Sequence, residues 1–141
     1  AKYQLFGTGI IITYKGKLHS MKQTVIGVFE DDKIDRFIYE RLFSHYTDCL
    51  VVHVFDNAKE GIEKAREIGF DMVYIDLHFW KDFGGESILK ELREVSDRDM
   101  ISLAITSLLQ AGDHERVTDA GFDLCIEKID FFRGVNLMQL S

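Results

Sequence analysis

The chain has 141 residues, of which 17 are Lys or Arg and 24 are Asp or Glu, so its formal net charge is −7. Its 46% hydrophobic and 29% charged content is typical of one folded globular domain and excludes an intrinsically disordered chain. The acidic balance and the lack of Lys/Arg runs longer than two residues disfavour direct binding to nucleic acid or to an anionic membrane surface. Proteins and cations are the partners that this charge favours.

Two features of the sequence bear on its compartment. Cys49 and Cys125 lie in separate apolar runs, which indicates buried free thiols in a reducing environment rather than a disulfide or a zinc site. No apolar stretch is long enough for a membrane span or for the hydrophobic region of a signal peptide. We therefore expect a cytoplasmic location.

Short apolar runs alternate with helical patterns from residue 23 onward. The runs are apolar nearly throughout and rich in Val, Ile and Phe, which is typical of parallel strands covered on both faces. Strands are predicted at residues 24–29, 49–55, 71–76, 101–106 and 123–128. The alternation predicts an α/β fold: a flavodoxin-like, doubly wound, five-stranded parallel sheet of order 2-1-3-4-5 with helices on both faces.

The helices between these strands have predictable ends and faces. Asp32 and Asp56 stand where N-caps are expected, and Gly69 and Gly121 stand where helices should stop. A short final helix is expected from about Asp130. The predicted apolar face of the first helix comprises Ile34, Phe37, Ile38 and Leu42.

The first 22 residues do not follow this rhythm. They predict either a strand or hairpin with glycine turns or a remnant that is foreign to the domain. We therefore divide the chain into an N-terminal extension at residues 1–22 and a folded domain at residues 23–141.

Acidic side chains follow two strands of the predicted sheet. Glu30, Asp31 and Asp32 come directly after the first strand, and Asp76 ends the third. Ligands of open parallel sheets bind beyond the carboxyl ends of the strands, where the strand order reverses, and these two strands are neighbours in the predicted order. Converging carboxylates need a cation, and Mg²⁺ prefers carboxylates, carbonyls and water. The sequence predicts a metal site here, although the acidic triplet alone is also compatible with a solvated loop and a helix cap.

Two further polar residues end the fourth and fifth strands. These are Thr106 and Lys128, and each alone is compatible with an ordinary strand end or surface position. Together with Asp76 and a divalent ion they supply a carboxylate nucleophile, a hydroxyl donor and a cation. Phosphoryl transfer onto an aspartate needs this set, because negative charge spreads over the phosphoryl oxygens in the transition state.

Over residues 23–138 the sequence resembles the CheY-like receiver domains of two-component response regulators. The resemblance rests on the acidic pair Glu30 and Asp31, on Asp76 at the phosphoacceptor position, on Thr106 and on Lys128, in the family's order and near its usual intervals. Gly84 also matches a glycine with which the family begins its third helix. The resemblance identifies residues 23–141 as a receiver domain.

The resemblance implies a site and a set of partners. Mg²⁺ would be held by Glu30, Asp31, Asp76 and the backbone carbonyl of His78, and Asp76 would accept a phosphoryl group from a sensor histidine kinase, a phosphotransfer protein or a small phosphodonor. The domain would act on a downstream protein target as a stand-alone receiver or a phosphorelay carrier, and a homodimer is left open. It would not be an enzyme, apart from catalysing its own phosphorylation and dephosphorylation.

The chain also departs from the family pattern. Ile129 follows Lys128 where the family has proline, and Cys125 occupies a position that is usually aromatic. Phe79, Trp80 and Phe83 follow the phosphoacceptor, either as loop packing, which we favour, or as an exposed docking surface.

Two other functions remain to be weighed. The departures allow a pseudo-receiver that is not phosphorylated and acts only as an interaction module, although the retained acids, Thr106 and Lys128 argue against it. A Mg²⁺-dependent phosphohydrolase resembling the haloacid dehalogenase group would need a second Asp two residues after Asp76. His78 occupies that position, so this function ranks last.

Overall fold

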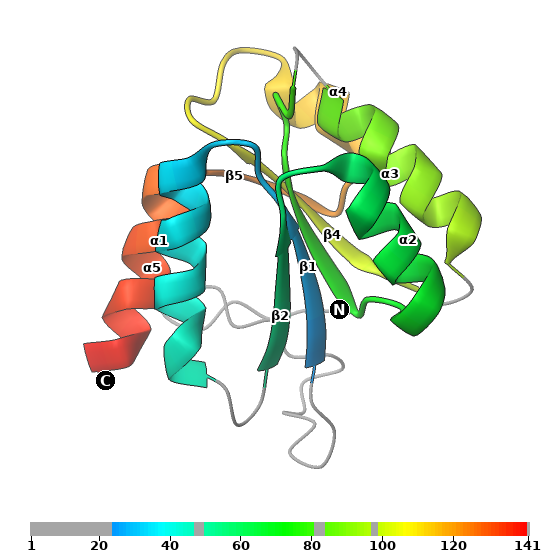
Figure 1. Cartoon of the computed structure of the whole chain (residues 1–141). Helices are drawn as coiled ribbons and strands as arrows, with labels where there is room; N and C mark the ends of the chain where they lie inside the picture. Colours follow the sequence, from blue (N-terminus) through cyan, green and yellow to red (C-terminus); the bar gives the residue numbers. More distant parts are fainter. Residues whose placement is uncertain (1–23, 47–49, 81–83, 97–98, 141) are drawn as a thin grey trace.

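The computed structural model describes residues 24–46, 50–80, 84–96 and 99–140 (Figure 1). The strands are β1 (Thr24–Phe29), β2 (Leu50–Phe55), β3 (Met72–Asp76), β4 (Ile101–Thr106) and β5 (Leu124–Glu127). The helices are α1 (Lys33–Phe43), the short 3-10 turn η1 (Ser44–Tyr46), α2 (Ala58–Ile68), α3 (Gly84–Val95), α4 (Asp113–Asp119) and α5 (Lys128–Leu140). All strand pairs are parallel and follow the order β2-β1-β3-β4-β5, so the flavodoxin-like fold is confirmed.

Two apolar clusters cover the two faces of the sheet. Helices α1 and α5 lie on one face, and α2, α3 and α4 lie on the other (Figure 1). Because successive side chains of a strand point to opposite faces, Met72 and Tyr74 join the first layer while Val73 and Ile75 join the second. Strand β3 is buried at all five positions, which explains why its sequence stays apolar until Asp76. The central strand therefore delivers one carboxylate to the carboxyl edge of the sheet.

The helix ends follow the predictions in most cases. The Asp32 side chain caps α1 by accepting a backbone N–H of the first turn at 2.9 Å, and Gly69, with φ of 70°, ends α2. Gly121, with φ of 99°, follows Ala120, the C-cap of α4. The predicted cap Asp56 is wrong, because the next residue, Asn57, accepts the first-turn N–H of α2 at 3.2 Å. Asp and Asn are both common N-cap residues, so the sequence alone placed the start of α2 one residue too early.

The final helix is longer than the sequence led us to expect. It begins at Lys128 rather than near Asp130 and has 13 residues. Phe131 in its first turn is fully buried and packs against Tyr39 of α1, with ring centroids 5.6 Å apart. This aromatic contact anchors α5 to the sheet from the helix's first turn.

The predicted apolar face of α1 is also partly wrong. Ile34 and Phe37 are 71% and 62% exposed, whereas Tyr39 and Phe43 make the buried contacts. The ring of Phe43 packs against Tyr74 of β3, with ring centroids 5.8 Å apart, and the ring of Tyr39 packs against Phe131 of α5. The helix is thus rotated so that its aromatic residues, rather than its first isoleucine, face the sheet.

Some sequence expectations fall outside the described residues. They concern the extension at 1–22, Cys49 and Phe83. Within the part of the chain that the structure describes, no helix combines the length and the apolar character needed to cross a membrane.

The start of α3 lies directly against the end of β3. The helix begins at Gly84, which is buried, and a Cβ atom at Gly85 would lie 2.6 Å from the backbone carbonyl oxygen of Asp76. Only a residue without a side chain lets the helix approach the strand so closely.

We expect Gly85→Ala to lower the free energy of unfolding by about 1–3 kcal/mol, because the added methyl group meets backbone rather than a movable side chain. Urea unfolding followed by circular dichroism measures this change. Ser87→Ala, at an exposed position of the same helix, is the control and should change the value by less than about 0.5 kcal/mol. Equal stabilities of the two variants would contradict the close approach.

Candidate functional site

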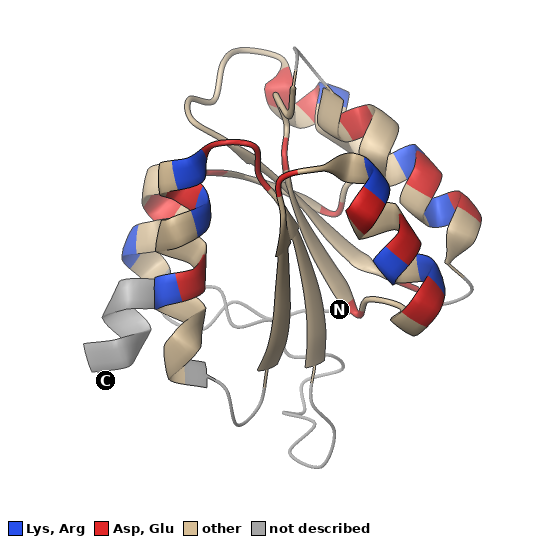
Figure 2. Ribbon diagram, in the orientation of Figure 1, with Lys and Arg blue, Asp and Glu red and all other residues tan. Residues whose placement is uncertain are grey.

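Acidic residues gather at the carboxyl edge of the sheet, on the segment after β1 and at the end of β3 (Figure 2). Glu30, Asp31 and Asp76 can each contribute one oxygen so that the three atoms lie within 4.8 Å of one another. Glu30 is fully buried and Asp76 is 8% exposed, whereas Asp31 faces solvent. The structure thus brings together the three carboxylates singled out in the sequence.

Lys128 reaches into this carboxylate cluster from the first residue of α5. Its Nζ lies 2.5 Å from Glu30 Oε1, 2.7 Å from Asp35 Oδ2 and 3.4 Å from Asp76 Oδ2. Burial alone lowers the pKa of Lys128, but the hydrogen bond to Asp35, the close contact with Glu30 and the charge of Asp76 outweigh burial and raise it. The side chain is therefore a charged ammonium at neutral pH.

Glu30 has the most unfavourable surroundings for a charged carboxylate in this cluster. Burial raises its pKa to about 9, the neighbouring Asp76 acts in the same direction, and Lys128 opposes both. Although the Lys128 ammonium is close, neither Glu30 oxygen receives a well-directed hydrogen bond from the described residues. A buried carboxyl group with unsatisfied oxygens beside two further carboxylates fits a hard divalent cation such as Mg²⁺.

The carboxylate of Asp76 is held from two sides. The backbone N–H of His78 donates to Oδ1 at 3.0 Å, while Oδ2 faces the ammonium of Lys128. These contacts fix the rotation of the carboxylate at the end of β3. His78, whose carbonyl was predicted as a metal ligand, contributes here through its N–H.

Thr106 lies on the neighbouring strand, one residue beyond Ile105, which pairs with Asp76. It is fully buried, and its hydroxyl donates to the carbonyl of Leu108 at 3.4 Å. The same loop is tied to β5, because the Glu127 carboxylate accepts the N–H of Leu109 at 2.8 Å. Thr106 therefore stands beside the cluster with its hydroxyl engaged in the loop after β4.

Two further residues contact the site, Asp35, which the sequence analysis did not single out, and Trp80, which it did not assign to the site. Asp35, in the first turn of α1, accepts from Lys128 across 93 positions of the chain. Trp80 donates its backbone N–H to Asp31 Oδ2 at 2.9 Å and its indole N–H to the carbonyl of Asp56 at 3.3 Å. Position 35 is four residues after Asp31 in an acidic segment, and that spacing was the only signal in the sequence.

The loop after β3 holds Trp80 in an unusual conformation. Its φ is 65°, a left-handed value that costs a non-glycine residue about 1–2 kcal/mol, and its side chain is 72% exposed. Phe79 instead is buried, with its ring 6.4 Å from that of Phe29. Phe79 therefore packs in the core, in line with the favoured interpretation, and is no part of an exposed aromatic surface.

The departures after β5 also have a structural outcome. Strand β5 passes directly into α5 at Lys128, and no cis peptide bond occurs among the described residues. Cys125 is a buried free thiol, as predicted, and burial raises its pKa to about 11. The small thiol fills a position on β5 without a ring that could change rotamer.

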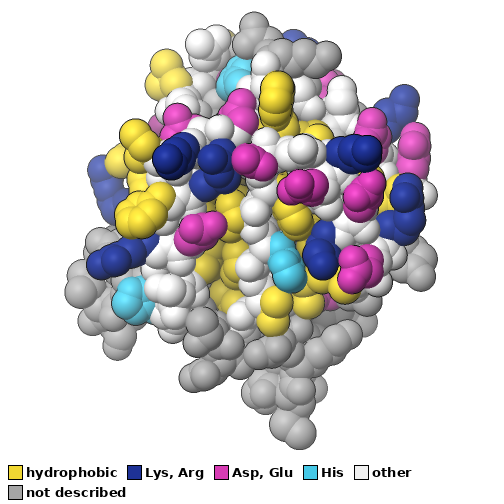
Figure 3. Space-filling view, in the orientation of Figure 1, with side chains coloured by type: hydrophobic (Ala, Val, Ile, Leu, Met, Phe, Trp, Pro, Cys, Tyr) yellow, Lys and Arg dark blue, Asp and Glu magenta, His cyan; other side chains and the backbone are white. Residues whose placement is uncertain are grey.

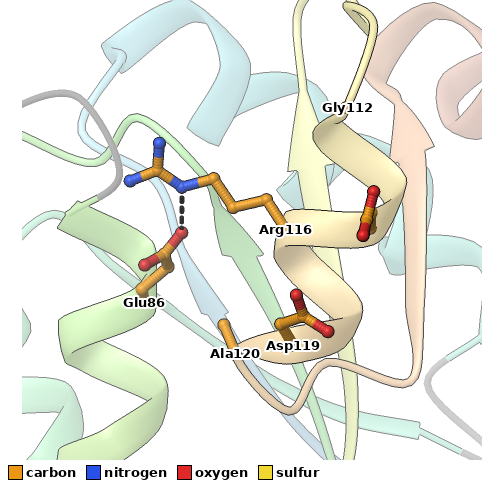
Figure 4. A pocket seen from close by; sticks show the side chains of 6 residues that line it. Glu86, Gly112, Arg116, Asp119 and Ala120 are labelled. Atoms are coloured by element: carbon orange, nitrogen blue, oxygen red, sulfur yellow. Dashed lines mark hydrogen bonds and ion pairs between the residues drawn. The ribbon is translucent and has the colours of Figure 1, made fainter.

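A separate hollow of about 500 Å³ lies between α3 and α4 (Figure 4). Its rim is bridged by an ion pair between Arg116 Nε and Glu86 Oε1 at 2.9 Å. None of its lining residues belongs to the carboxylate cluster, and Glu115 and Asp119 add further acidic groups. We therefore treat it as distinct from the candidate site.

No protein-family model matches the chain, and no curated protein matches its sequence. Solved structures match its fold. A CheY-like response regulator receiver domain from Methylobacillus flagellatus has a TM-score of 0.64 at 17% identity and covers 85% of this chain and 98% of its own. The receiver domain of the DNA-binding response regulator merR from Colwellia psychrerythraea 34H has a TM-score of 0.68 at 20% identity, with coverages of 84% and 98%.

A third similar structure is the BeF3-activated N-terminal receiver domain of RstA from Klebsiella pneumoniae. Its TM-score is 0.67 at 20% identity, and the match covers 83% of this chain and 95% of that one. The chain therefore has the fold of response regulator receiver domains, as the sequence resemblance predicted.

We expect the metal-free protein to lose stability as the pH rises from 4.5 to about 9. Between these values folded Glu30 keeps a proton that the unfolded chain has released, so the folded state binds more protons and stability falls with pH. Glu30→Gln should flatten this slope, measured by urea unfolding in a chelating buffer. Glu40→Gln, at an exposed position of α1, should leave the slope unchanged, and equal slopes in both variants would contradict the assignment.

Proposed function

We propose that this chain is a phosphorylation-switched signalling domain that accepts a phosphoryl group on Asp76 in the presence of Mg²⁺. The observation that carries the proposal is the position of the Asp76 carboxylate, 3.4 Å from the Lys128 ammonium and beside the carboxylates of Glu30 and Asp31. Transfer onto a carboxylate oxygen needs cations around the phosphoryl oxygens, and this arrangement supplies one and can bind the other.

The residues would divide the work as follows. Glu30, Asp31, Asp76 and the carbonyl of His78 would hold Mg²⁺, which supplies charge neutralisation at the phosphoryl oxygens when bound. An Asp76 oxygen would attack phosphorus, so that a new O–P bond forms while the bond from phosphorus to the donor breaks. The donor's leaving atom takes the electron pair of that bond.

Lys128 and Thr106 would then stabilise the product. The Lys128 ammonium already lies beside Asp76 and would pair with a phosphoryl oxygen. The Thr106 hydroxyl would exchange its 3.4 Å contact with Leu108 for a phosphoryl oxygen, which draws the loop after β4 inward. Such a shift changes the surface that a protein partner meets.

The proposed partners follow from this chemistry. A sensor histidine kinase, a phosphotransfer protein or a small phosphodonor would supply the phosphoryl group, and a downstream protein would read the result. Residues 23–141 would be the receiver domain and residues 1–22 an extension, and the domain would act alone or as a phosphorelay carrier.

We expect the chain to gain the mass of one phosphoryl group when it is incubated with acetyl phosphate and Mg²⁺, and we expect Asp76→Asn to gain none. The substitution is nearly isosteric and removes only the nucleophilic carboxylate. Intact-mass spectrometry measures the gain.

The matched control is Asp32→Asn, because Asp32 is acidic and nearby but serves as a helix cap, a role that asparagine also fills. This control should be phosphorylated like the wild type. A full mass gain in Asp76→Asn would refute the assignment, and no gain in the folded wild type would favour the pseudo-receiver.

We expect Mg²⁺ to change the fluorescence of Trp80 and to raise the melting temperature, and we expect Asp31→Asn to lose both effects. A metal that binds Asp31 draws on the same carboxylate that accepts the Trp80 N–H and so changes the surroundings of the indole, whereas asparagine keeps an acceptor for that N–H without the charge. Fluorescence titration and thermal unfolding measure the two effects. An unchanged melting-temperature response in Asp31→Asn would remove Asp31 from the ligand set.

A further inference from the structure

Strand β2 forms one edge of the sheet, and β1 is the only described strand that pairs with it. The carbonyl of Phe55 accepts the N–H of Glu30 at 3.0 Å, so the backbone groups of Phe55 face β1. Backbone groups alternate in direction along a strand, so every second residue turns its N–H and C=O away from β1. These outward-facing residues are Leu50, Val52 and Val54.

The sequence of this edge is unusual for an exposed strand. The six residues of β2, LVVHVF, include no Lys, Arg, Asp, Glu or Pro, although charges and prolines are what natural edge strands use to prevent pairing. Burial, and then the charge of Lys64, lower the pKa of His53 below its ordinary value. The His53 imidazole is therefore neutral at pH 7, and it adds no charge to this edge. An uncharged edge of this kind is a template for another strand.

The surroundings of the edge favour one occupant. The chain carries a net charge of −7, so two copies repel each other over most of their surfaces. The helices that flank β2 are exceptions, because α2 has three basic and three acidic residues and α1 has three basic and two acidic residues. In Figure 3 apolar side chains and backbone line the strip over β2 between these mixed-charge flanks. A second copy therefore meets the least repulsion along this strip.

We propose that the outer edge of β2 pairs with the same edge of a second copy of this chain, antiparallel about a two-fold axis at Val52. In this register Val52 faces Val52 of the partner subunit, and Leu50 faces Val54 of the partner subunit. Each protomer then satisfies its three outward N–H and three outward C=O groups, and only uncharged side chains of β2 meet. The contact is self-complementary and continues the sheet across both protomers.

This dimer goes beyond the proposed function and does not depend on it. The carboxylate cluster lies at the carboxyl edge of the sheet, whereas the proposed contact runs along the side of β2, so the site stays accessible in the dimer. Failure of phosphorylation would leave the dimer prediction intact, and the reverse is also true.

Sedimentation velocity of the full chain tests the proposal. The 16.3 kDa protomer should associate reversibly to twice its mass as the concentration rises to about 0.5 mM. This range detects dimers as weak as a Kd of about 1 mM. Val52→Pro removes an outward N–H and spares the bonds to β1, and Val51→Lys places a charge in the pairing strand. Each should weaken the dimer at least about tenfold.

The control is Leu108→Lys, which adds the same charge at an apolar residue that is 63% exposed in the loop after β4. It should leave association unchanged. Circular dichroism checks that every variant is folded, and Val51→Lys decides the matter if Val52→Pro unfolds the chain.

Amide hydrogen exchange gives a second readout at residue level. The N–H groups of Leu50, Val52 and Val54 should become protected as the wild-type concentration rises, and should stay unprotected in Val51→Lys. A monomer at every concentration would overturn the proposal, as would a dimer that both β2 variants leave intact. Protection of these amides in a dilute monomer would also overturn it, because the chain's own residues or another segment would then cover the edge.

Discussion

The contact of the Lys128 ammonium with the carboxyl groups of Glu30, Asp35 and Asp76 is the interaction on which the carboxyl edge of the sheet depends. Those four side chains come from the end of β1, the first turn of α1, the end of β3 and the start of α5. Removing the ammonium would leave the buried Asp76 carboxylate without this counter-charge, which is far more costly than losing an exposed ion pair. One cation therefore holds four elements together and orients the aspartate at the same time.

This arrangement is a poor choice for stability alone. Two apolar layers already cover the sheet, and hydrophobic side chains in place of a buried ion cluster are often as stable or more so. The buried carboxyl oxygens of Glu30 receive no well-directed hydrogen bond from the part of the chain that the structure describes, and Trp80 keeps a left-handed backbone in the loop after β3. Such costs are typical of places where a ligand or a reaction offsets them, which supports the proposed role of this edge in binding.

The sequence revealed the strands and the main carboxylates for a physical reason. A strand covered on both faces must be apolar at every position, so Asp76 at the end of β3 stands out against its neighbours. The role of Asp35 could not be seen, because it depends on a partner 93 positions away. The face of α1 was misjudged because periodicity marks apolar positions without saying which of them the tertiary packing buries. The packing buries Tyr39 and Phe43 and leaves Ile34 exposed.

The junction between β5 and α5 has a mechanical meaning. The strand ends at Glu127 and the helix starts at Lys128, so no loop separates the sheet from the helix. Because Lys128 is itself the first residue of α5, a displacement of its backbone is a displacement of the helix, with no intervening loop to absorb it. Three residues further along, Phe131 presses on the aromatic layer of α1, so the charge beside β3 and the packing of an entire face share one rigid linkage.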